Sequence, residues 1–179
     1  MIQKALIEKW KYSRPGIERH ETRALVMHYT AVPGATAANI RNSYARKIER
    51  YRSAHFAIDW GGNVIQIMPE MEKAYHCGAW RYMPGITDKL GPDPNMTTIG
   101  VEMCHEDASG SLHRTALHYA ELLAAYLCKR YELHPTSQIL RHYDVTGKRC
   151  PLWWVIYPED LTHFQMRVKE MLVDRWSLL

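Results

Sequence analysis

Residues 23–40 read RALVMHYTAVPGATAANI, and this stretch carries the clearest sign of the fold class. Residues 23–29 are largely apolar on both faces and partly β-branched or aromatic, which predicts a buried strand ending at His28. A turn over AVPGAT follows, and Thr36 can cap a helix whose apolar side chains recur at helical spacing. The predicted stripe consists of Ala37, Ile40, Tyr44, Ile48 and Tyr51.

Three other segments have the composition of strands. Two of them, residues 54–60 and 64–69, flank a Gly-Gly-Asn turn, and residues 97–104 form a third, apolar strand. Residues 138–144 predict a short strand or extended segment. Residues 77–97 are rich in Gly and Pro, which predicts a long irregular loop.

Two long helices follow from periodicity. One begins after Ser111 and ends near Tyr131, with Leu117, Ala120, Ala124, Leu127 and Tyr131 along one face. The other opens at Pro158, and its stripe is Leu161, Phe164, Val168, Met171 and Trp176. Strands interleaved with helices predict a single α/β domain over residues 1–179, and the hairpin favours a central mixed β-sheet flanked by helices.

The composition excludes several classes of protein. The 179 residues suit one domain, and 46% hydrophobic with 23% charged residues argues against disorder. The net charge is +4, and the Lys and Arg residues are scattered along the chain, so we expect no nucleic-acid partner. No apolar run approaches the ~18 residues of a membrane span, so we expect no membrane insertion. The first residues lack the pattern of a signal peptide, so we expect synthesis in the cytoplasm without one.

A histidine and a cysteine stand eight positions apart in HYDVTGKRCP, residues 142–151. His142 and Cys150 offer one nitrogen and one sulfur ligand, and the turn at Gly147 can bring both to one centre. His28, a polar side chain at the end of an apolar strand, is the best candidate for the third ligand. The other cysteines are Cys77, Cys104 and Cys128. The sequence has no CxxC motif, so we expect free thiols or metal ligands and neither disulfides nor a zinc ribbon.

Other interpretations of these residues stay open at this point. Cys150 and His142 could form a nucleophile and its base, although Pro151 removes an N–H group that such sites use. His28 could be a hydrogen-bonded core histidine, and His55 is more typical of one. Cys104 lies on the same side as Glu102 by strand alternation and could be a fourth ligand.

Five segments in order resemble the zinc-dependent N-acetylmuramoyl-L-alanine amidases, a family that includes phage endolysins and is related to peptidoglycan recognition proteins. They are the HY of residues 28–29, SAHFAID, AYHCGAW, TTIGVEMC and HYDVTGKRCP, and they span about residues 23–155. The resemblance implies one Zn²⁺ per chain, bound by His28, His142 and Cys150. It implies catalytic roles for Glu102 and Lys148, and it places His76 near the substrate cleft.

The resemblance also has departures and consequences. Some relatives carry a catalytic tyrosine where this chain has Ala54, and the strand glutamate is typical of the endolysins and autolysins of Gram-positive hosts. Cys150 as third ligand favours the branch that lyses cell walls over the recycling enzymes, which have an aspartate there. Trp80 in the irregular loop could contact sugar, and Asp144 could orient a zinc histidine or cap the turn.

The resemblance therefore implies an enzyme that hydrolyses the amide between N-acetylmuramic acid and L-alanine in peptidoglycan, such as a phage or prophage endolysin released by holin-dependent lysis. A peptidoglycan-binding module on the same fold and a thiol hydrolase are the alternatives. Such endolysins often carry a wall-binding domain, and none is evident in residues 1–179.

Overall fold

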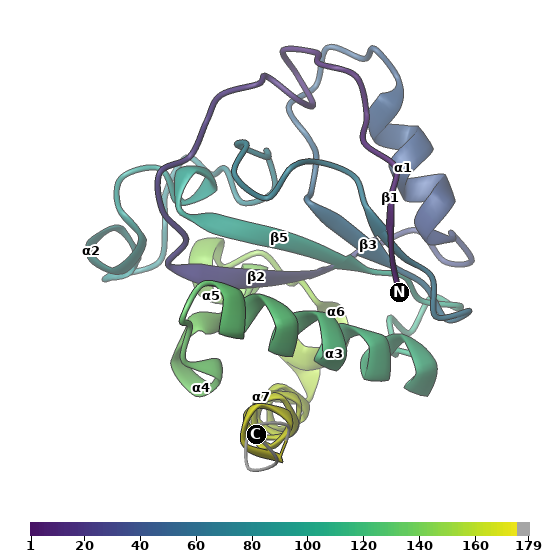
Figure 1. The fold of residues 1–179 in the computed structure, drawn as a ribbon, viewed down its shortest axis with the longest axis vertical. Helices are drawn as coiled ribbons and strands as arrows, with labels where there is room; N and C mark the ends of the chain where they lie inside the picture. Colours follow the sequence, from purple (N-terminus) through teal and green to yellow (C-terminus); the bar gives the residue numbers. More distant parts are fainter. Residues whose placement is uncertain (175–179) are drawn as a thin grey trace.

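The computed structural model describes residues 1–174 and is built on a six-stranded sheet (Figure 1). The strands are β1 (Ile2–Lys4), β2 (Ala24–Tyr29), β3 (Phe56–Ile58), β4 (Val64–Gln66), β5 (Thr98–Met103) and β6 (Ile139–Arg141). Their order across the sheet is β1-β4-β3-β5-β2-β6. Only the β3–β4 pair is antiparallel. The predicted mixed sheet is confirmed, and β2 and β5 lie at its centre.

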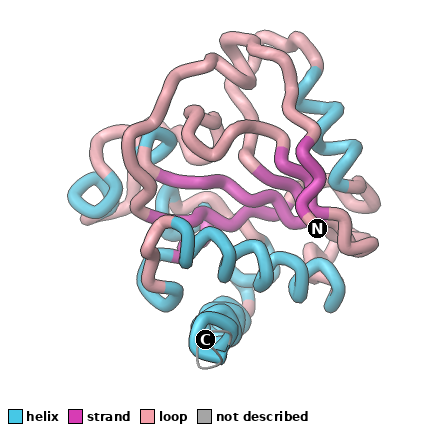
Figure 2. Tube along the Cα trace, viewed as in Figure 1, coloured by secondary structure: helices cyan, strands magenta, loops and turns pink. Residues whose placement is uncertain are grey.

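Helices cover both faces of this sheet (Figures 1 and 2). The longer ones are α1 (Ala37–Ala45), α3 (Arg114–Arg130) and α7 (Pro158–Asp174). The short ones are α2 (Ile86–Leu90), the 3₁₀ helix η1 (Pro94–Met96), α4 (Pro135–Gln138), α5 (His142–Thr146) and α6 (Leu152–Ile156). Helix α3 runs across one face with α7 packed beneath it, whereas α1 contacts β3 and β4.

Side-chain alternation along the central strands separates an apolar face from a face that carries chemistry. Leu25 and Met27 of β2 pack in the same cluster as the buried face of α3. Ile99, Val101 and Met103 of β5 join that cluster. Because successive side chains of a strand point to opposite faces, His28 and Glu102 lie on the other face. The parallel register pairs these two residues directly.

Helix α1 begins as the sequence predicts and ends earlier. Thr36 caps it, with a reciprocal capping box between Thr36 and Asn39. The helix stops at Ala45, so the prediction that Ile48 and Tyr51 continue its buried stripe is wrong. The backbone is extended at the C-cap Arg46, and the 62% exposed Tyr51 instead contacts the rings of Tyr12 and Tyr75, with centroids 4.8 and 4.9 Å away.

The remaining predicted elements are present with shifted boundaries. Helix α3 begins at Arg114, three residues beyond Ser111, and the irregular loop over 77–97 contains α2 and η1. Residues 142–144, predicted as extended, form the start of α5. Leu161, Phe164 and Val168 are buried along α7, and Trp176 lies outside the described residues. Within residues 1–174, no helix is long and apolar enough to cross a membrane.

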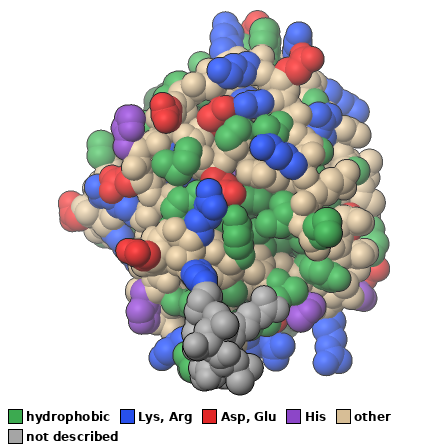
Figure 3. Space-filling model, in the orientation of Figure 1, with side chains coloured by type: hydrophobic (Ala, Val, Ile, Leu, Met, Phe, Trp, Pro, Cys, Tyr) green, Lys and Arg blue, Asp and Glu red, His purple; other side chains and the backbone are tan. Residues whose placement is uncertain are grey.

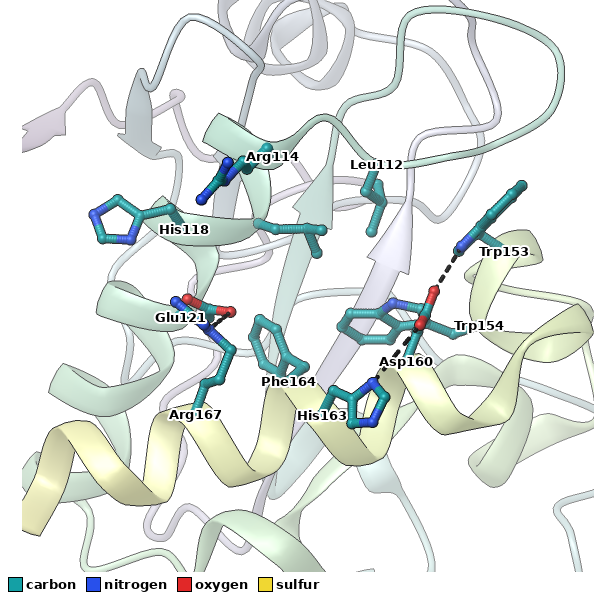
Figure 4. Close-up of a pocket in the computed structure, with 11 residues that line it drawn as sticks. Leu112, Arg114, His118, Glu121, Trp153, Trp154, Asp160, His163, Phe164 and Arg167 are labelled. Carbon is teal, nitrogen blue, oxygen red and sulfur yellow. Dashed lines mark hydrogen bonds and ion pairs between the residues drawn. The ribbon is translucent and has the colours of Figure 1, made fainter.

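A cavity of about 490 Å³ lies between α3, α6 and α7, on the α3 side of the sheet (Figure 4). Two pairs of its polar groups are joined by hydrogen bonds. Arg167 Nε donates to Glu121 Oε1 at 2.8 Å, and Trp153 Nε1 donates to Asp160 Oδ2 at 2.7 Å. On the face shown in Figure 3, basic and acidic side chains are likewise interspersed.

Candidate metal centre and active site

Three ligand-bearing side chains meet at the carboxyl edge of the parallel strands. His28 is near the end of β2, and His142 directly follows β6, the strand paired with β2. Cys150 returns to the same place because Gly147 adopts a left-handed conformation after α5. One ligand atom from each side chain lies within 4.8 Å of the others, and all three residues are buried. The predicted cluster is thus assembled, and it could hold a metal ion.

The state of these three groups fits a metal cation. His142 Nδ1 is buried without a hydrogen-bond partner, and His28 Nδ1 lies 3.8 Å from Cys150 Sγ. Burial raises the pKa of the Cys150 thiol to about 12 and lowers the pKa of His142 to about 4. A bound cation would stabilise the thiolate and occupy the nitrogen lone pairs. Two imidazoles with one thiolate form a donor set that suits zinc.

The same burial argues against a cysteine nucleophile. Reactive cysteines need a lowered thiol pKa, which a neighbouring cation or helix N-terminus provides. Burial has the opposite effect on Cys150 and also keeps His142 from being the cationic partner. The thiol-hydrolase alternative therefore has no support from the electrostatics of this pair.

Glu102 stands beside the cluster on a central strand. Strand β5 lies between β3 and β2, so Glu102 belongs to an interior strand of the sheet. Tyr44 donates its hydroxyl proton to Glu102 Oε1 at 3.0 Å, whereas Oε2 is buried with no partner. Burial raises the pKa of Glu102 to about 7, although Tyr44 and Lys148 favour the ionised form. A carboxylate with this pKa can exchange a proton near neutral pH.

An open cleft of about 1160 Å³ leads to these groups. His28, His142, Cys150 and Glu102 line it. Lys148, Arg50 and Arg52 add positive charge to its walls, and Trp80 projects into solvent at 107% exposure. The sequence-predicted residues Lys148 and Trp80 therefore share one cleft with the candidate metal ligands.

Other candidate residues take different positions. Cys104 is outside the metal-ligand cluster and packs in an apolar cluster with Ala37 and Ala57, so a fourth-ligand role is wrong. Asp144 accepts from the Arg141 backbone N–H at 2.8 Å and pairs with its guanidinium, so it caps α5. His55 is a core histidine, as its pattern indicated: its Nδ1 accepts from the Gly100 N–H at 3.0 Å.

His76 is buried directly behind His28. Its Nδ1 lies 3.1 Å from His28 Nε2, and its other ring nitrogen lies 3.1 Å from Thr98 Oγ1. Thr98 was not singled out from the sequence, and Tyr44 was predicted only as part of an apolar stripe. The missing tyrosine at Ala54 is the one sequence signal that could have prompted a search for another hydroxyl beside Glu102.

The family resemblance implies hydrolysis of peptidoglycan. For this reaction, we expect Tyr44→Phe to move the acid limb of the pH–rate profile to higher pH. The tyrosine hydroxyl favours the ionised carboxylate, so its loss raises the pKa of Glu102 further. A hydrogen bond to a charged group contributes ~1.5 kcal/mol, so activity at pH 6, below the pKa of Glu102 in both proteins, should fall roughly tenfold. Activity should recover at higher pH, where Glu102 is ionised again.

The matched control is Tyr126→Phe, which removes a hydroxyl from an exposed side chain of α3. It should leave the profile unchanged. An equal loss for Tyr44→Phe at every pH would contradict a role for the hydroxyl in the ionisation of Glu102.

Fold and site together define an α/β protein with a His-His-Cys cluster at the carboxyl edge of a mixed sheet. Residues 18–153 match the sequence profile Amidase_2, N-acetylmuramoyl-L-alanine amidase, and the chain belongs to this family.

Named relatives agree with this assignment. The chain is 40% identical over 165 residues to a probable N-acetylmuramoyl-L-alanine amidase of Bacillus licheniformis, covering 90% of this chain and 45% of that protein. It is 40% identical over 178 residues to the amidase CwlL of the same species, covering 97% and 48%. It is 39% identical over 166 residues to the amidase BlyA of Bacillus subtilis (strain 168), covering 89% and 44%. The chain thus spans just under half the length of these relatives.

Solved structures share the fold. The structure of PlyL superposes with a TM-score of 0.75 at 24% identity, covering 94% of this chain and 96% of that one. The catalytic domain of XlyA gives a TM-score of 0.73 at 22% identity, covering 94% and 99%. The predicted amidase-like α/β fold is confirmed.

Proposed function

We propose that this chain is a zinc-dependent N-acetylmuramoyl-L-alanine amidase of the endolysin type. It would hydrolyse the amide between N-acetylmuramic acid and L-alanine in peptidoglycan. The observation that carries the proposal is the buried His28, His142 and Cys150 cluster, which opens on the same cleft as Glu102. Membership of the amidase family supports the substrate and the reaction.

Different residues of the cleft would have different roles in amide hydrolysis. Zinc held by His28, His142 and Cys150 would supply Lewis acidity to the scissile carbonyl and to water. Glu102, with its pKa of about 7, would accept a proton from the attacking water and deliver it to the leaving amine. Lys148, on the wall of the cleft, would stabilise the negative charge that develops on the carbonyl oxygen.

The remaining cleft residues suit a charged glycopeptide. Arg50 and Arg52 offer cations to the carboxylates of a stem peptide, and the exposed ring of Trp80 offers a surface for sugar. We propose that Trp80 contacts the glycan strand. Because the amide lies in the cell wall, the protein would act there, reaching it through lysis-dependent release.

Product analysis on purified cell walls tests this function. The zinc-loaded chain should release new amino groups whose N-terminal residue is alanine, without new reducing sugar ends. New reducing ends would indicate a glycosidase and contradict the proposal. Binding to walls without release of amino groups would favour the alternative, a recognition module on the same fold.

A further inference from the structure

A chain of buried hydrogen bonds runs from the sheet to the candidate metal ligand His28. Thr98 Oγ1 lies 2.6 Å from the Pro94 carbonyl oxygen. His76 Nε2 lies 3.1 Å from Thr98 Oγ1 and 3.4 Å from the Thr98 carbonyl oxygen. His76 Nδ1 lies 3.1 Å from His28 Nε2. The side chains of Thr98, His76 and His28 are 0%, 7% and 3% exposed, so water does not compete for these bonds.

The direction of each bond follows from which atoms can donate. A carbonyl oxygen only accepts, so the Thr98 hydroxyl proton points to Pro94. Thr98 Oγ1 then accepts from His76, and the Thr98 carbonyl near the same nitrogen can also only accept. His76 therefore carries its proton on Nε2.

The proton on His76 Nε2 leaves Nδ1 as an acceptor, provided that the ring is neutral. In the described structure the ring nitrogens of buried His76 hydrogen-bond to Thr98 and His28, and neither partner is a carboxylate, so a protonated ring would be a buried charge without a counter-ion. The bare Nδ1 can then only accept from His28 Nε2. A neutral His28 with its proton on Nε2 has a free lone pair on Nδ1, the atom that lies 3.8 Å from Cys150 Sγ.

We propose that Thr98 and His76 are positioning residues that lock His28 in the tautomer whose Nδ1 is free to bind the metal ion. This inference rests on the proposed metal centre, and it gives His76 a role through His28 in place of direct contact with substrate. Hydrogen bonds that fix the tautomer of a metal-binding histidine raise metal affinity, and their loss typically costs ~10–100-fold.

The surroundings of His76 hold its ring in place before any metal arrives. The ring lies over Gly100, where an added Cβ would come 2.5 Å from His76 Cγ. The backbone N–H of His76 donates to Asn95 Oδ1 at 3.0 Å. Gly100 is thus the residue that lets the ring approach the strand, and the ring cannot rotate into the cleft without losing bonds at both nitrogens.

The first test is the tautomer of the metal-free wild-type chain, read from long-range ¹H–¹⁵N correlations of the histidine rings. We expect pyridine-type Nδ1 and protonated Nε2 for both His28 and His76. A proton on Nδ1 of His28 would overturn the proposal. This measurement needs no variant to fold and no cell wall.

The second test uses matched variants and a zinc titration against a chromophoric chelator. Thr98→Val removes the hydroxyl acceptor for His76 with little change of shape and leaves only the more distant Thr98 carbonyl, whereas Thr98→Ser restores the hydroxyl. Thr98→Val and His76→Phe should weaken zinc binding, by ~10–100-fold for His76→Phe, and mix the His28 tautomers. Thr98→Ser should bind zinc as the wild type does. Unchanged affinity and tautomer in Thr98→Val and His76→Phe would overturn the proposal.

Kinetics separate this inference from the proposed function. At saturating zinc, kcat of Thr98→Val should approach the wild-type value, because the variant acts on metal binding and not on the reacting atoms. A wild-type chain that binds zinc with the predicted tautomer and does not cleave walls would contradict the amidase function alone. A chain that cleaves walls with the opposite His28 tautomer would contradict the positioning role alone.

Discussion

Cys150→Ser is expected to abolish both zinc binding and cell-wall lysis. A serine hydroxyl is a far poorer zinc ligand than a thiolate, and only His28 and His142 would remain in the cluster. Lewis-acid stabilisation by a catalytic zinc is worth several kcal/mol, so activity should fall at least ~10³-fold. Elemental analysis should find one zinc per wild-type chain and almost none in the variant, and a turbidity assay on the same samples should follow the metal.

The matched control is Cys128→Ser, the same chemical change at a buried cysteine of α3 on the opposite face of the sheet. It should keep both zinc and activity. A metal-free wild-type chain that still lyses walls would overturn the zinc mechanism and return Cys150 to consideration as a nucleophile. Zinc binding retained by Cys150→Ser, with activity, would show that the metal lies elsewhere.

Glu102→Gln is expected to lower kcat ~10²–10⁴-fold while zinc content stays at the wild-type level. Glutamine has the shape of glutamate and can still accept from Tyr44, so the fold and the three metal ligands should persist. It cannot take a proton from water at any accessible pH. Rates measured on zinc-loaded protein of equal metal content isolate this loss.

The pH dependence of the wild-type rate is a second test of Glu102 as the base. A base must be deprotonated, so with a pKa raised to about 7 the wild-type rate should fall tenfold for each pH unit below that value. The residual rate of Glu102→Gln should not show this fall below pH 7. Glu106→Gln, an exposed change in the loop after β5, serves as the control. A Glu102→Gln chain with wild-type activity would rule out Glu102 as the base.

Local patterns foretold a large part of the fold. The apolar run over β2, the Thr36 cap and the Gly-Gly-Asn turn depend on neighbours a few residues away, and each was found where predicted. The short segment from His142 to Cys150 likewise holds two of the three candidate metal ligands within nine positions. Such features are visible in sequence because the side chains that define them are close along the chain.

Other features of the fold depend on contacts between segments that are distant in sequence. Helix α1 stops at Ala45, and Tyr51 beyond it contacts Tyr12 and Tyr75 from other segments, which no periodicity reveals. The short strand β1, which no local pattern indicated, pairs with β4. Strand pairing and packing can override local propensity because they bury more surface than a single helical turn does.

The site divides in the same way. Local sequence, with the family resemblance, was sufficient to name His28, His142 and Cys150 as candidate ligands and Glu102 as a candidate base. The register of β2 against β5 and the packing of α1 brought Tyr44 to Glu102 across 58 positions, and His76 to His28 across 48. The choice of candidate ligands depends on side-chain chemistry, which the sequence gives directly for each residue. The protonation of those ligands depends on burial and on partners from other segments, which exist only once the chain is folded.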